Sequence, residues 1–159
     1  LTSYSLYLDN MKDWFNETVA SDWMDDRQRM MSLLTEEAAL EEIVQMVGMD
    51  ALSPSDRLKM EAARSIREDF LHQNSFHEVD TYTPLRKEYL MMKLVLAFYD
   101  QASEALNKGA SMKDLLVMDV REKIGRYKYT LAENIETEYE KIMDELGKEV
   151  AGTIGKEDF

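Results

Sequence analysis

Apolar side chains recur every three or four positions across residues 22–47, and neither glycine nor proline interrupts them. This spacing places the apolar side chains on one face of a helix. At about 1.5 Å per residue the helix would span roughly 40 Å, so it can serve as the spine of a domain. The apolar positions are Trp23, Met30, Leu33, Leu34, Leu40, Ile43, Val44 and Val47.

Residues 48–56 carry the signals that end this helix and begin another. Gly48 can adopt the left-handed conformation that terminates helices. The next helix is marked by an N-cap, by a first residue without a backbone donor and by a first-turn carboxylate, at Ser53, Pro54 and Asp56. The chain is therefore expected to reverse as a helical hairpin whose tip exposes Met49 and Leu52. Such a tip is either a plain connector or a contact surface.

The same periodicity predicts further helices on both sides of the hairpin. They are expected over residues 5–18, 54–71, 83–107 and 131–146, with two short helices between residues 111 and 125. The helix over residues 83–107 is the most apolar and is expected at the centre of the fold. The predicted fold is an all-α helical bundle of about five to six helices, covering residues 8–146 and built on a long antiparallel helical hairpin. The pattern is lost over residues 147–159, which are expected to form a disordered tail.

The composition restricts the chemistry that the chain can perform. Its formal net charge of −13 argues against nucleic acid as a partner, because binding phosphates requires clustered lysine and arginine. A basic or neutral protein surface is a better match. With no cysteine, the chain has no disulfide, no thiolate nucleophile and no cysteine-ligated zinc. No apolar run approaches the roughly 20 residues that cross a bilayer.

Residues 70–82 break the helical pattern and alternate aromatic, amide and acidic side chains. His72 and His77 could in principle bind a divalent metal with nearby carboxylates, but their spacing does not bring both imidazoles to one helical face. Residues 152–157 lack the glycine spacing of a phosphate loop. No combination of nucleophile, base and orienting residue is recognisable, and the glutamate-rich helix faces match solvated surfaces. We therefore expect neither a metal site nor a catalytic residue.

Several stretches, in the same order, resemble one protein family. Residues 43–53 (IVQMVGMDALS) and 67–82 (REDFLHQNSFHEVDTY) resemble the C-terminal domain of the catalytic A subunit of archaeal and vacuolar-type rotary ATP synthases. Residues 120–126 (VREKIGR) resemble a motif near the end of that subunit. Residues 1–7 (LTSYSLY) look like the exit from its nucleotide-binding domain, so the resemblance implies that they are a junction from that domain.

The resemblance implies two sites. In the family the hairpin tip touches the rotating central stalk, so the rotor contact would comprise Gly48, Met49, Asp50, Ala51, Leu52, Ser53, Pro54, Ser55 and Asp56. The family segment that closes over the adenine ring corresponds to residues 73–76. The residues implied in adenine binding are Phe76, Ser75, Asn74, Gln73 and Phe70. Phe76 is the expected stacking residue and Phe70 the second candidate, while an ordinary loop with Phe76 in the core remains the alternative.

The resemblance also implies the setting. ATP or ADP with Mg would bind the parent subunit, an ion-translocating ATP synthase, whereas this chain alone lacks a phosphate loop and would bind no cofactor and be inactive. The implied partners are the upstream nucleotide-binding domain, the central-stalk rotor subunits and the neighbouring B subunits, with no nucleic acid and no membrane insertion. The implied location is cytoplasmic, peripheral to the membrane through the assembled complex.

One departure from the related F-type pattern concerns the tip. Residues 53–55 (SPS) stand where the F-type beta subunit has consecutive carboxylates, which leaves Asp50 and Asp56. Shape contact through the apolar residues of the tip is therefore an equal alternative to electrostatic torque transfer. A stand-alone acidic helical module that binds other proteins is the alternative function.

Overall fold

The computed structural model describes residues 17–70 and 82–154, and in this part of the chain it contains helices and no strand. The predicted all-α fold is confirmed. The α-helices are α2 (Glu17–Val47), α3 (Pro54–Ser65), α4 (Tyr82–Asn107), α5 (Met112–Leu116), α6 (Asp119–Arg126) and α7 (Ile135–Ile154). Short 3₁₀ segments are η1 (Met49–Ala51), η4 (Tyr127–Tyr129) and η5 (Ala132–Asn134), and the π-helical turn η2 (Ile66–Phe70) continues α3.

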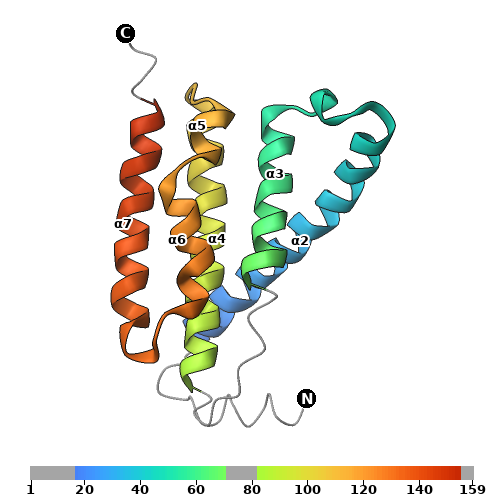
Figure 1. The fold of residues 1–159 in the computed structure, drawn as a ribbon. Coiled ribbons are helices and arrows are strands. Elements are labelled where there is room, and N and C mark those ends of the chain that lie inside the picture. Colours follow the sequence, from blue (N-terminus) through green and yellow to red (C-terminus); the bar gives the residue numbers. More distant parts are fainter. Residues whose placement is uncertain (1–16, 71–81, 155–159) are drawn as a thin grey trace.

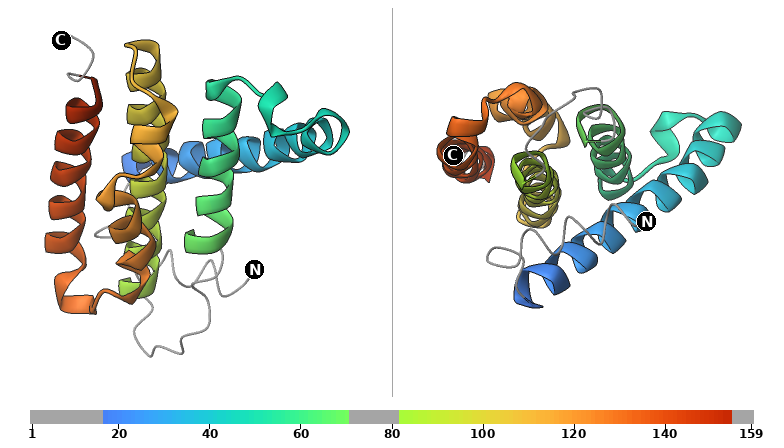
Figure 2. Two further views of the ribbon diagram at one scale, coloured as in Figure 1. Left: turned by 45° about the horizontal axis from the view of Figure 1, so that its top comes forward. Right: turned by 90° about the horizontal axis from the view of Figure 1, so that it is seen from below.

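The helices are arranged in three layers around α4. Figure 1 shows α4 between α3 and α7, and the view from below in Figure 2 shows α2 crossing one side of α3 and α4, with α6 on the other side. α2 and α3 diverge towards the tip that joins them (Figure 1). The last turns of α2 therefore extend beyond the rest of the bundle.

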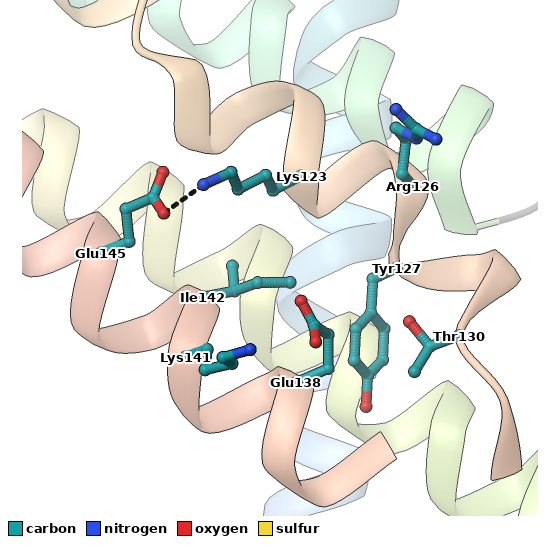
Figure 3. A pocket seen from close by; sticks show the side chains of 8 residues that line it. All are labelled: Lys123, Arg126, Tyr127, Thr130, Glu138, Lys141, Ile142 and Glu145. Atoms are coloured by element: carbon teal, nitrogen blue, oxygen red, sulfur yellow. Dashed lines mark hydrogen bonds and ion pairs between the residues drawn. The ribbon is translucent and has the colours of Figure 1, made fainter. Parts of the chain in front are cut away.

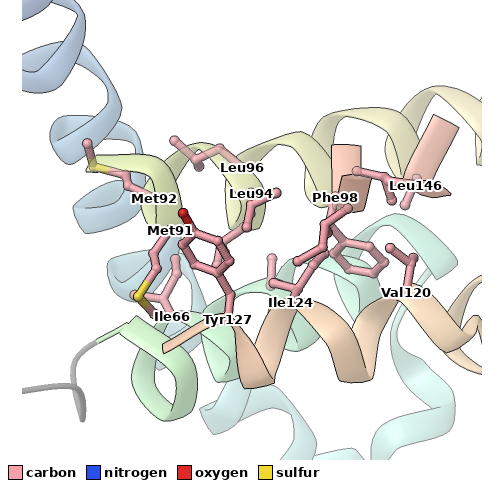
Figure 4. Close-up of a cluster of buried hydrophobic side chains, with 14 of the residues drawn as sticks. Ile66, Met91, Met92, Leu94, Leu96, Phe98, Val120, Ile124, Tyr127 and Leu146 are labelled. Atoms are coloured by element: carbon pink, nitrogen blue, oxygen red, sulfur yellow. The ribbon is translucent and has the colours of Figure 1, made fainter. Parts of the chain in front are cut away.

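The central position predicted for α4 is confirmed by its burial. Leu94, Val95 and Phe98 are almost completely inaccessible to solvent, and they pack with Val120 of α6 and Leu146 of α7 (Figure 4). Residues on both sides of α4 are buried because α2, α3, α6 and α7 each cover part of its surface. A helix that is apolar around most of its circumference is stable only in such a position.

The signals that the sequence places at the tip act as expected. Gly48 has a φ of 91°, a conformation that costs glycine little because it has no Cβ. Ser53 caps α3, since the backbone NH of Asp56 donates to its Oγ at 3.1 Å, and Pro54 is the first helical residue. The same type of cap starts α5, where Ser111 accepts from the NH of Asp114 at 3.1 Å.

The predicted boundaries of α2 and α7 are wrong. α7 does not end at Leu146 but continues to Ile154, so the expected disordered tail is wrong for residues 147–154. The reason is that Val150 and Thr153 continue the buried face of the helix, and the two glycines in this stretch do not interrupt it. α2 begins at Glu17, five residues before the predicted start, because no residue from 17 to 22 breaks a helix. Residues 155–159 and most of the predicted helix over residues 5–18 lie outside the described part of the chain.

Candidate functional site

The hairpin tip exposes most of the residues that the resemblance implied in rotor contact. Asp50, Ala51, Ser53, Pro54 and Ser55 are exposed, as is Met49 at 46% of its maximal accessible area, while Gly48 and Asp56 are half-buried. Leu52 differs, since only 7% of its surface is accessible. The expectation that Leu52 is exposed at the tip is therefore wrong: its side chain turns inward and packs under the loop.

Exposed apolar side chains instead continue from the tip into the last turns of α2. Met46 is 82% exposed, Val47 65% and Ile43 42%. Together with Met49 we call these residues the apolar tip surface. Large apolar side chains gathered on one exposed surface are characteristic of contact sites. α2 diverges from α3 here (Figure 1), and Ile43 and Val47, which the periodicity assigned to the buried face, are exposed among the described residues.

The sequence contained a signal for this surface. Residues 43–47 (IVQMV) hold four apolar residues out of five, and consecutive positions of a helix point about 100° apart. They cannot all face one neighbouring helix. A short run of this kind at the end of an amphipathic helix indicates apolar side chains on a second, exposed face.

Arg57 of α3 braces the tip. Its Nη2 donates to Oδ1 of Asp50 at 3.2 Å and lies 3.5 Å from the carbonyl oxygen of Met49. Asp50 therefore has a counter-ion within its own hairpin. Lys59 of α3 lies 3.8 Å from Glu36, and Arg67 of η2 pairs with Glu37, so two more ion pairs join α3 and its continuation η2 to α2. These contacts fix the position of the tip relative to both helices.

The residues implied in adenine binding are not placed by the structure. Phe76, Ser75, Asn74 and Gln73 lie outside the described residues, and so does the side chain of Phe70, although its backbone ends η2. The described approach to this segment is the π-helical turn η2. Turns of this kind are rare and occur often at functional sites.

Contacts from α6 and η4 hold η2 in place. Nζ of Lys128 donates to the carbonyl oxygen of Glu68 at 3.1 Å, and Nε of Arg64 donates to Oε1 of Glu68 at 3.2 Å. Gly125 of α6 faces Asp69 so closely that a Cβ there would lie 3.1 Å from Oδ1 of Asp69. Burial raises the pKa of the Asp69 carboxyl, and Lys128 only partly offsets this effect.

A cluster of charged residues that the sequence reasoning missed joins α2 to α4. Nζ of Lys93 lies 2.5 Å from Oδ2 of Asp22 and 2.6 Å from Oδ2 of Asp26, whose side chain is almost buried. The hydroxyl of Tyr89 donates to Asp22 at 2.5 Å, and its ring stacks on Trp23 with centroids 5.6 Å apart. The cluster is already paired internally, so it stabilises the α2–α4 contact and leaves no free base.

The ionisation of this cluster follows from its pairing. Burial and the hydrogen bond to Asp22 raise the pKa of Tyr89 to about 12. Burial alone would lower the pKa of Lys93, but its hydrogen bonds to Asp22 and Asp26 outweigh that effect and raise it. Lys93 is therefore charged throughout the physiological range. A signal in the sequence was the single lysine within the otherwise apolar run of residues 89–99.

The described residues also form a cavity between α6 and α7, of about 300 Å³ (Figure 3). Its lining includes Tyr127 and Ile142 together with the charged side chains of Arg126, Lys141 and Glu138. Among the described residues no group of three or more histidine or acidic side chains could hold a metal, and no helix is long and apolar enough to cross a membrane. His72 and His77 lie outside those residues.

Comparisons with known proteins assign this arrangement to a family. A family model described as the C-terminal domain of V and A type ATP synthase matches residues 12–116. The chain is 54% identical over 157 residues to the V-type ATP synthase alpha chain of Acetivibrio thermocellus, covering 99% of this chain and 27% of the relative. It is 56% identical over 156 residues to the alpha chain of Clostridium botulinum strain Hall, covering 98% and 26% respectively. For Thermoanaerobacter pseudethanolicus the identity is 53% over 154 residues, covering 97% and 26%. The chain thus spans about a quarter of the length of these relatives.

Proposed function

This chain belongs to the family of C-terminal domains of V- and A-type ATP synthases, as part of an alpha chain, and on that premise we propose that it transmits nucleotide-dependent movement of the alpha chain to the central rotor. The alpha chain would be the catalytic subunit of an ion-translocating ATP synthase. This domain would transmit the movement, and the rest of the subunit would carry out ATP synthesis or hydrolysis.

The apolar tip surface supports this proposal most strongly. Met46, Val47 and Met49 are exposed on a part of the hairpin that extends beyond the bundle, so much of their apolar surface is available to a partner. Methionine is flexible and polarisable, so it can keep contact with a surface that changes as the rotor turns. The tip would therefore touch the rotor mainly through apolar contact.

The packing of the domain is suited to transmitting force. α2 is tied to α4 by Lys93 near its start and to α3 by two ion pairs further along, and α3 packs on the buried helix α4. Close-packed helices move as a unit because their interiors compress little. A displacement at the end of α3 near η2 would thus appear at the tip.

The second proposed site is the adenine segment. Phe76 would stack on the adenine ring, with Gln73, Asn74 and Ser75 beside it and Phe70 as the second aromatic candidate. ATP or ADP with Mg would bind the complete alpha chain, since this chain has no phosphate loop. The described support for the proposal is η2, which is held firmly by Lys128 immediately before this segment.

The proposed partners follow from this arrangement. The domain would contact the nucleotide-binding part of its own subunit, the rotor subunits of the central stalk and the neighbouring B subunits of the catalytic ring. The assembled complex would hold it at the cytoplasmic surface of the membrane.

Cysteine crosslinking tests the proposal directly, because the chain has no cysteine of its own. Met46→Cys, labelled in the assembled complex with a thiol-directed photoreactive crosslinker, is expected to crosslink to a rotor subunit on irradiation. Met24→Cys is a matched control, since Met24 is also an exposed methionine of α2, at 59%, but lies near the other end of the helix. Equal crosslinking from both positions, or none from Met46, would contradict the proposed rotor contact.

A further inference from the structure

The corner between α6 and α7 exposes two large apolar side chains at the end of the bundle opposite the tip. Tyr129 of η4 and Leu131 are each 64% exposed, although the turns around them are well packed. Figure 1 shows this corner near the start of α4 and the end of α3, far from the tip. We call Tyr129, Leu131 and the intervening Thr130 the apolar corner.

The apolar corner is rigid. The NH of Thr130 donates to the carbonyl oxygen of Tyr127 at 2.9 Å, and the carbonyl oxygen of Thr130 accepts from Nζ of Lys87 at 2.7 Å. The buried Tyr127 donates its hydroxyl to the carbonyl oxygen of Ile135 at 2.6 Å. Side chains that are presented by a fixed backbone lose little freedom on binding, so Tyr129 and Leu131 are preorganised for contact.

A concave surface adjoins these two convex side chains. The cavity between α6 and α7 includes Thr130 in its lining, and Tyr127 closes one side of it (Figure 3). Arg126 is also a lining residue, and among the described residues it forms an ion pair with Glu122, 3.8 Å away, in which both side chains are exposed. An exposed aromatic residue and an exposed leucine beside a cavity lined in part by an arginine match the composition of protein contacts in which a few residues dominate.

The surroundings of the corner indicate what covers it. Nζ of Lys128, next to the corner, donates to the carbonyl oxygen of Glu68, two residues before Phe70, and Lys87 of α4, the helix that follows the adenine segment, donates to Thr130. The corner is thus bonded to both flanks of the part of the chain assigned to the nucleotide side. Nearly all of this chain matches only about a quarter of each relative, so most of an alpha chain lies outside the structure.

We propose that the nucleotide-binding part of the same alpha chain packs against the apolar corner. It would cover Tyr129 and Leu131 and place a carboxylate near Arg126. This rests on the proposed function, because it takes the domain as one end of an alpha chain. The contact would transmit movement into α6 and α7.

Photocrosslinking in the full-length alpha chain tests this. A photoreactive benzoylphenylalanine in place of Tyr129 should crosslink within the same polypeptide to residues that precede Leu1. The matched control is the same replacement at Val117, which is 68% exposed between α5 and α6 and should give several-fold less of this product. Crosslinks formed only to another subunit of the complex, only to a second copy of the chain, or equally from both positions would overturn the proposal.

A second variant keeps the two proposals distinguishable. Tyr129→Ser with Leu131→Ser changes only exposed side chains, so the domain should fold, while cleavage by protease between it and the rest of the alpha chain should become several-fold faster. Val117→Ser should not change that rate. Faster cleavage of the double variant, with no rotor crosslink from Met46, would support the corner contact and reject the rotor contact. A rotor crosslink from Met46, with unchanged cleavage of the double variant, would support the rotor contact and reject the corner contact.

Discussion

Nη2 of Arg57 lies 3.2 Å from Oδ1 of Asp50 and binds the tip of the helical hairpin to the first turns of α3. Asp50 is fully exposed, so water screens this pair and its effect on stability is small. The pair nevertheless gives Asp50, the acidic residue at the middle of the tip, a positively charged neighbour in Arg57. The exposed apolar side chains of Met46, Val47 and Met49 are then the other features of the tip that a partner could contact.

Leu52 should act on stability rather than on rotor contact. Leu52→Ala leaves a cavity under the tip and should lower the free energy of unfolding by about 2 to 4 kcal/mol. Met49→Ala, at an exposed position of the same tip, should change it by less than about 0.5 kcal/mol. Urea denaturation of the chain measures both, and equal effects would show that Leu52 is not buried in solution.

Lys93 should be essential for the contact between α2 and α4. Lys93→Ala leaves the almost buried carboxylate of Asp26 without its positive partner, which should cost about 3 kcal/mol of unfolding free energy. Lys148→Ala removes a lysine from a solvent-exposed pair with Asp144 and serves as the control, with little effect. The comparison uses thermal or urea unfolding, and similar losses in the two variants would argue against the buried cluster.

Asp69 should make stability depend on pH. Its pKa is raised by burial above the ordinary 3.8, so between these two values the folded state keeps a proton that the unfolded state has lost. Its contribution to stability therefore falls as pH rises through that window and stays lower above it.

The variant Asp69→Asn removes this effect. The free energy of unfolding of this variant should equal that of the original chain at about pH 3.5 and should be the larger of the two at about pH 7. Urea unfolding at both pH values gives the difference. A variant that is less stable at neutral pH would mean that the ionised carboxylate is favourably paired, with Lys128 as the nearest cause.

Phe76 is predicted to contribute to nucleotide affinity in the complete alpha chain. Phe76→Ala should weaken ATP binding by about 1 to 3 kcal/mol if its ring stacks on adenine. Phe70→Ala tests the second candidate in the same titration. Unchanged affinity in the Phe76 variant, with loss in the Phe70 variant, would exchange their proposed roles.

The sequence predicted the fold well where local signals decide the structure. Gly48 and Ser53 act as a helix end and a helix cap because their effects depend on their immediate neighbours. The predicted end of α7 was wrong because Val150 and Thr153 continue its buried face beyond Leu146, although two glycines interrupt the pattern there. Tertiary contacts of that kind leave little trace in a short window of sequence.

The candidate site was less predictable for a related reason. Leu52 and Met46 are both apolar residues near the tip, yet one is buried and the other is the most exposed of the large apolar residues described. The angle at which α2 leaves α3 decides between these outcomes, and periodicity carries no information about that angle. The pairing of Lys93 with Asp26 likewise depends on how two helices cross.

We infer that the tip acts on the rotor through apolar contact. The most direct test is the number of ions moved per ATP hydrolysed by the assembled complex. Met46→Ser combined with Val47→Ser should lower this ratio clearly, while Asp50→Asn should leave it near that of the unmodified complex. If Asp50→Asn instead lowered the number of ions moved per ATP, and the apolar double variant left it unchanged, the apolar contact would be contradicted and an electrostatic contact favoured.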